Sequence, residues 1–144
     1  MLWTMLLLMQ PATAGVFPYP VASHVLDNGL SVHVVPTPSE GVVSYYTWMN
    51  VGSRDEVDPG RTGFAHFFEH LMFLGTEKLS GDEREAALLT MAAEDNAWTW
   101  FDETVYHVTL AAPNLPRLIE MEADRFQGLV LTADDVQRLS LIHI

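Results

Sequence analysis

Two histidines and a glutamate stand close together in the segment His66-Phe67-Phe68-Glu69-His70. In a helix, residues i, i+3 and i+4 lie on one face, so His66, Glu69 and His70 would share a face. Two imidazoles one helical turn apart can bind one metal ion, and a carboxylate between them can reach a water on that metal. The spacing predicts a metal centre for hydrolysis; the alternative is an ordinary helix face on which the three residues meet by chance.

Composition limits the ligands and the partners of such a centre. The chain has no cysteine, so a metal must be held by His, Asp, Glu or water. With 19 acidic and 7 basic residues the formal net charge is −12, which excludes a basic surface able to neutralise phosphates. The chain is therefore not expected to bind nucleic acid.

The first elements read as strands. Residues 21–26 and 30–35 are rich in β-branched residues and flank Asn28-Gly29, a strong hairpin signal. In the second run, apolar residues alternate with polar ones, which predicts a half-buried strand. Residues 42–51 are β-branched and aromatic and predict a long central strand.

The helix that carries the histidines is expected at residues 63–74, with Gly75 as its C-cap. It is apolar nearly all round, which predicts a buried helix. Buried polar groups need partners, so the environment of His66, Glu69 and His70 matters.

The remaining pattern places helices and strands in alternating groups. A capping box at residues 80–83 opens a helix to about residue 93, and two strands follow at residues 96–100 and 104–111. Asn114 is expected to cap a helix that runs to about residue 127, and Thr132 begins another. The predicted fold class is α+β, an antiparallel or mixed sheet with helices packed on one face.

The N-terminus suggests export. Residues 3–9 form an apolar run that is too short to span a bilayer, so no stable membrane span is expected. Ala12-Thr13-Ala14 resembles a signal-peptidase site, which predicts a signal peptide over residues 1–14 and a periplasmic or secreted protein. Because a basic n-region is missing, an apolar N-terminal strand or a misplaced start codon is the alternative.

The motifs together resemble the pitrilysin, insulin-degrading enzyme and mitochondrial processing peptidase family of inverzincins, whose zinc motif has the order His-x-x-Glu-His. The resemblance covers about residues 22–138 and implies part of the first half of a metallopeptidase domain, at residues 15–138. The matching segments are residues 26–30, 51–56, 63–76, 96–99, 104–106 and 122–126.

The resemblance implies that His66 and His70 bind Zn²⁺ and that Glu69 is the general base. It also implies a third ligand, a glutamate on a later helix, which would fall just past Ile144. Residues 139–144 do not fit that charged helix and are expected to be a non-native tail, so the chain is interpreted as a truncated, inactive fragment. The residues of this chain that could replace the missing third ligand are Glu94, Asp134, Asp135 and His143.

The same resemblance implies the partners. The substrate would be a peptide or unfolded protein that adds a strand to the edge at residues 96–100, where Asn96 contacts its backbone and Trp98 lines a side-chain pocket. Strand-end hydrogen bonding for Asn96 and sheet packing for Trp98 are the alternatives. A second homologous half, from the same chain or a partner subunit, is also implied. The runner-up function is a non-catalytic structural subunit of the same family.

Overall fold

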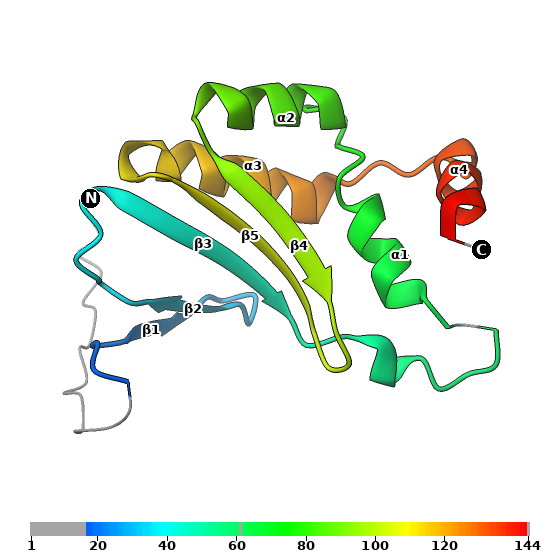
Figure 1. Ribbon diagram of the computed structural model, residues 1–144, viewed down its shortest axis with the longest axis horizontal. Coiled ribbons are helices and arrows are strands. Elements are labelled where there is room, and N and C mark those ends of the chain that lie inside the picture. The colour runs from blue at the N-terminus through cyan, green and yellow to red at the C-terminus, as the bar shows by residue number, and fades with distance from the viewer. Residues whose placement is uncertain (1–16, 61, 144) are drawn as a thin grey trace. The chain divides into compact units, whose positions relative to one another are not determined.

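The computed structural model describes residues 17–60 and 62–143 (Figure 1). For Arg138 and residues 140–143 it describes the backbone but not the side chains. The chain divides into two compact units, Met1–Glu40 and Gly41–Ile144. The predicted signal peptide at residues 1–14 lies outside the described residues. Among the helices that are described, each falls short of the length and apolar character that a bilayer span requires.

The first unit contains the predicted hairpin, with β1 (Ala22–Val25) antiparallel to β2 (Ser31–Val34). Gly29 adopts φ +87° in the turn, a conformation that glycine reaches at little cost. The predicted half-burial of the second strand is wrong, because Val32 and Val34 are 37% and 51% exposed. A two-stranded hairpin has no further layer of its own to cover an apolar face.

The second unit is built on a three-stranded antiparallel sheet in the order β3-β5-β4. Its strands are β3 (Val42–Met49), β4 (Glu94–Thr99) and β5 (Thr104–Ala111). The prediction of a central strand at residues 42–51 is therefore wrong: β5 is the central strand and β3 is at an edge. Composition favours a strand at β3, but it does not reveal how many neighbours that strand has.

Helices cover one face of this sheet, as predicted for an α+β fold. The core joins Val108 and Leu110 of β5 to α2 (Gly81–Thr90) and α3 (Leu115–Gly128). The two helices lie along the same side of the sheet (Figure 1). The buried core residues on this side are Leu88 of α2, Met91 directly after α2, and Leu118 and Met121 of α3.

The opposite face of the sheet carries aromatic side chains. Because side chains alternate along a strand, His107 points away from the face that holds Val108. Tyr46 stacks on His107 with ring centroids 5.3 Å apart, and Trp98 contacts Tyr46 and Trp48 edge-on. This face is partly exposed, with Trp48 at 55% and Trp98 at 37%.

Helix starts were predicted with mixed success. Ser80 and Glu83 form the expected capping box of α2, and Thr132 and Asp135 form the equivalent bonds at α4 (Ala133–His143). Asn114 directly precedes α3 but makes no cap bond; its Nδ2 donates to the carbonyl of Met91 at 3.4 Å. Its backbone is already helical, whereas a capping side chain needs an extended residue.

Candidate metal centre

The two histidines lie on α1 (Phe64–Leu71), which is shorter than the predicted helix. The chain leaves the helix after Leu71 through tighter bonds, such as Phe73 N to His70 O at 3.1 Å. Gly75 does not cap the helix: it adopts φ +111° and forms a bridge with Ser80. A Cβ at Gly75 would lie 2.5 Å from the backbone nitrogen of Gly81, so close backbone packing explains this glycine.

Only one side of α1 is buried. Ala65, Glu69 and Leu71 are buried, whereas Phe64 and Phe68 are 48% and 51% exposed. The prediction of a helix buried all round is therefore wrong for the described residues. The helix contacts β4 and α4, and these contacts leave Phe64 and Phe68 exposed.

The two imidazoles converge. The Nε2 atoms of His66 and His70 are 3.1 Å apart, and the ring centroids are 4.7 Å apart. With Zn–N bonds of about 2.0–2.1 Å and a tetrahedral angle, two ligating nitrogens stand about 3.3 Å apart. The pair therefore fits two neighbouring positions of a zinc ion with only a small adjustment.

Glu69 lies on the buried side of α1, at 8% exposure. Its Oε2 accepts a hydrogen bond of 2.5 Å from the Oγ1 of Thr99, the last residue of β4. The Thr104 hydroxyl lies 3.4 Å from that of Thr99 and donates to the carbonyl of Val51. The carboxylate is thus held by a side chain that belongs to the edge strand of the sheet.

Of the residues predicted to bind the metal, the structure brings together two histidines, and the described residues supply no third ligand beside them. Within residues 17–60 and 62–143, no group of three or more His, Cys, Asp or Glu residues could hold a metal ion. Of the substitute ligands, Asp135 accepts bonds from Thr132 at the start of α4, while Asp134 and Glu94 are exposed. The side chain of His143 is outside the described residues.

The predicted substrate residues lie on the exposed edge strand. Asn96 and Trp98 both belong to β4, whose only described strand neighbour is β5, and both point to the face that carries the aromatic side chains. Asn96 Oδ1 accepts a bond from the Ala97 nitrogen at 2.8 Å, and Trp98 packs against Tyr46. These contacts agree with the alternatives of local hydrogen bonding for Asn96 and sheet packing for Trp98. They do not test whether either residue contacts a substrate.

A buried charge cluster beneath the sheet was missed by sequence reasoning. Glu122, at 1% exposure, pairs with Arg125 and with Arg84 Nη2 at 3.2 Å, and Arg84 also pairs with Asp95 at 2.9 Å. Burial lowers the pKa of Arg125, and Glu122 opposes that effect. The partners Arg84 and Glu122 are 38 residues apart in sequence, so a local pattern does not reveal their pairing.

Tyr106 packs against this cluster. The Arg125 guanidinium carbon is 4.8 Å from the centre of the Tyr106 ring, and Phe126 packs on the ring edge-on. Burial raises the pKa of Tyr106 to about 12; Arg125 lowers it, and Glu69 and Glu122 add to the increase. The tyrosine therefore remains neutral through the physiological range.

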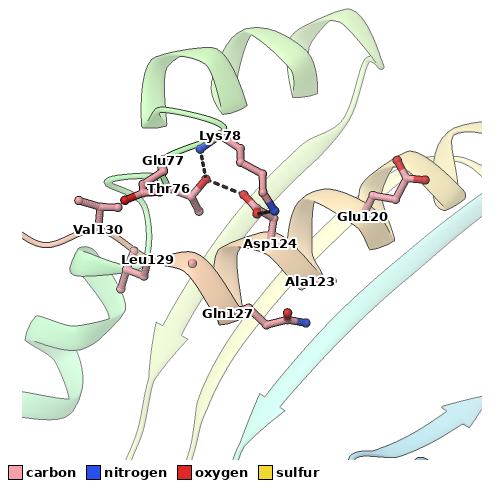
Figure 2. Close-up of a pocket in the computed structure, with 10 residues that line it drawn as sticks. Thr76, Glu77, Lys78, Glu120, Ala123, Asp124, Gln127, Leu129 and Val130 are labelled. Carbon is pink, nitrogen blue, oxygen red and sulfur yellow. Dashed lines mark hydrogen bonds and ion pairs between the residues drawn. The ribbon is translucent and has the colours of Figure 1, made fainter.

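The loop that follows α1 is fastened to α3. Figure 2 shows the Thr76 hydroxyl and the Lys78 ammonium group directed at Asp124, with distances of 2.5 and 2.8 Å. Hydrogen bonds hold the pKa of Asp124 below its usual value; the bond from Lys78 has the larger effect and the bond from Thr76 the smaller. Glu77 is exposed in the same loop.

Comparison with known proteins gives one family. The sequence matches the insulinase family, peptidase family M16, over residues 32–143. It is 33% identical over 111 residues to an uncharacterized zinc protease of Streptomyces coelicolor, covering 77% of the chain and 24% of that protein. It is 35% identical over 115 residues to the mitochondrial-processing peptidase subunit beta of Rattus norvegicus, covering 78% of the chain and 23% of that protein.

Solved structures agree with these relatives. A protease from Helicobacter pylori superposes with a TM-score of 0.79 at 34% identity, covering 83% of the chain and 29% of that protein. The periplasmic protease PqqL from Escherichia coli has a TM-score of 0.73 at 28% identity, covering 80% and 14% respectively. The chain therefore spans about a quarter of the length of the curated relatives described above.

Proposed function

Since the chain belongs to the insulinase family, peptidase family M16, we propose that it is part of a zinc-dependent endopeptidase. His66 and His70 are the proposed zinc ligands, and the 3.1 Å separation of their Nε2 atoms is the observation that carries this proposal. Two relatives support it by name, one as a zinc protease and one as a peptidase subunit.

Glu69 is the proposed general base. When bound, zinc would lower the pKa of a water molecule to about 7 and polarise the scissile carbonyl. The Glu69 carboxylate would accept the proton of the attacking water and return it to the leaving amine. Because the Thr99 hydroxyl bonds Oε2, it fixes the carboxylate and leaves Oε1 as the oxygen that takes the proton.

The chain by itself is proposed to be inactive as a peptidase. A catalytic zinc usually has three protein ligands and one water, and the described residues bring together two histidines. In the whole protein, a third ligand and a second homologous half, from the same chain or a partner subunit, would complete the site. The same reasoning leads us to expect only weak zinc binding by residues 1–144.

The proposed substrate is an extended peptide that pairs with the free edge of β4. This edge is close to α1, because Thr99 at its end contacts Glu69. Backbone bonding along an edge strand gives affinity without sequence preference, and side-chain pockets add specificity. Asn96 is the proposed backbone contact, and Trp98 is the proposed wall of a side-chain pocket.

Export to the periplasm or outside the cell is the proposed location. The predicted signal peptide at residues 1–14 and the similarity to a periplasmic protease support it. Cell fractionation followed by N-terminal sequencing tests it: a mature chain that begins near Gly15 is expected, and an intact Met1 in the cytoplasm would contradict it.

Calorimetric titration with Zn²⁺ tests the metal site. We expect weak binding that is abolished in His70→Ala and retained in Glu69→Gln, because only the first change removes a ligand. His107→Ala is the matched control, since it removes an imidazole from the opposite face of the sheet. Binding that survives His70→Ala, or that falls equally in His107→Ala, would contradict the proposal.

Peptide hydrolysis separates the proposed enzyme from the runner-up. The purified chain is expected to leave an unfolded peptide intact, and measurable hydrolysis would overturn the predicted inactivity. An assembled protein that keeps His66, Glu69 and His70 and binds zinc without cleaving peptides would favour the non-catalytic subunit.

A further inference from the structure

The N-terminal turn of α1 is capped by a residue outside the helix. Glu56 Oε2 accepts a bond from the Gly63 nitrogen at 2.6 Å, and Glu56 Oε1 accepts one from the Ala65 nitrogen at 2.7 Å. The first N–H groups of a helix have no partner within it, and Gly63 has no side chain to supply one. A carboxylate at this end also complements the positive end of the helix dipole.

Glu56 is itself held in place by the turn between β4 and β5. The Ser53 nitrogen donates to the Trp100 carbonyl at 3.0 Å, and the Arg54 nitrogen donates to the Phe101 carbonyl at 2.8 Å. Gly52 is buried against the same turn, and a Cβ there would lie 2.4 Å from the Trp100 oxygen. The segment Gly52–Glu56, here called the 52–56 loop, therefore cannot be shifted without moving the turn.

The 52–56 loop gives α1 a second attachment to the same end of β4. Thr99, directly before the turn, bonds Glu69 in the second half of α1, and Glu56 bonds the backbone at its start. The residue after Ala65 is His66, so the capped turn carries the first histidine. A helix of eight residues is marginal by itself, and its first turn depends on outside bonds.

We propose that Glu56 is a positioning residue of the metal centre: its carboxylate holds the first turn of α1, which keeps His66 within ligating distance of His70. The part of this proposal that concerns zinc rests on the proposed function. The part that concerns helix capping rests only on the hydrogen bonds of Glu56. Without the cap the first turn frays, and the 3.1 Å approach of the two Nε2 atoms is lost.

The test compares wild type, Glu56→Ala and Glu56→Gln with the control Glu77→Ala, which removes an exposed charge after the other end of α1. We expect amide hydrogen exchange at Ala65 and His66 to be about tenfold faster in Glu56→Ala, as loss of a helix cap implies. Glu56→Gln keeps one acceptor oxygen and should fall between. Glu77→Ala should match wild type.

Two further measurements are the zinc affinity and the contact between the two imidazole rings. Neither would change if Glu56 only stabilised the fold. At a temperature where every variant is folded, Glu56→Ala should bind Zn²⁺ about tenfold more weakly and lose the nuclear Overhauser effect between the His66 and His70 rings. Unchanged exchange at Ala65, or faster exchange with unchanged ring contact, would overturn the proposal. A wild type that binds no zinc would contradict the proposed zinc binding by this chain, while exchange and ring contact would still decide the role of Glu56.

Discussion

Replacing Glu122 by glutamine removes the one charge that two buried guanidinium groups share. Glu122 is 1% exposed as a side chain, and its partners Arg84 and Arg125 are 7% and 2% exposed. Breaking a buried ion pair by removing one partner costs about 3–5 kcal/mol, because a charge is left uncompensated in the interior. Arg84 would keep Asp95 at 2.9 Å, and the glutamine would keep one acceptor oxygen, so we expect about 3 kcal/mol.

Urea unfolding followed by circular dichroism measures this loss. Glu120→Gln is the matched control, since it makes the same change at an exposed position on the same helix; its effect should stay within about 0.5 kcal/mol. A loss of less than about 1 kcal/mol in Glu122→Gln, or one equal to the control, would refute the view that the cluster holds α3 against α2 and β4.

Other predictions concern the groups around Glu69 and the edge strand. The raised pKa of Tyr106 means that its contribution to stability is complete below pH 10 and is lost as the pH rises from 10 to about 12; the loss is about 2–3 kcal/mol. Urea unfolding across that range should show this slope in wild type and a smaller one in Tyr106→Phe, and equal slopes would count against it. Thr99→Val should lower the free energy of unfolding by about 1–3 kcal/mol, because the buried Glu69 carboxylate loses its donor. The control Thr109→Val removes one hydroxyl of an exposed hydrogen-bonded pair on the other face of the sheet, and equal effects of the two changes would contradict this reasoning. Trp98→Ala should weaken peptide binding by the assembled protein about tenfold in a fluorescence titration, and unchanged affinity would assign Trp98 to sheet packing.

Local signals predicted most of the elements. The Asn28-Gly29 hairpin, the Ser80–Glu83 capping box and strands β4 and β5 depend on residues that are close in sequence, and all were confirmed. The family resemblance was likewise confirmed. The signals for these features lie within a few neighbouring residues, so they can be recognised from the sequence.

Features that depend on distant neighbours were not predicted. The edge position of β3 and the exposure of Phe64 and Phe68 depend on which elements pack nearby. Gly75 carried the right signal for an unusual backbone conformation, but the close approach of Gly81 explains it rather than a helix cap.

The supporting residues of the site were also hidden. Thr99 is 30 residues from Glu69 in sequence, and Glu56 acts on a helix that starts eight residues later. A threonine or a glutamate at these positions is not by itself a signal for such a role. The histidine spacing therefore indicated the chemistry, but not the residues that hold the α1 side chains in place. The metal and catalytic roles of His66, His70 and Glu69 remain predictions.

Zinc K-edge X-ray absorption of the zinc-loaded chain measures the ligands directly. Two imidazole nitrogens at about 2.0–2.1 Å are predicted for wild type and for Glu69→Gln, whereas His70→Ala, which is expected to lose zinc binding, should show no zinc–imidazole neighbours. A wild-type spectrum with only oxygen neighbours, or one that does not change in His70→Ala, would contradict the assignment of His66 and His70 to a common ion.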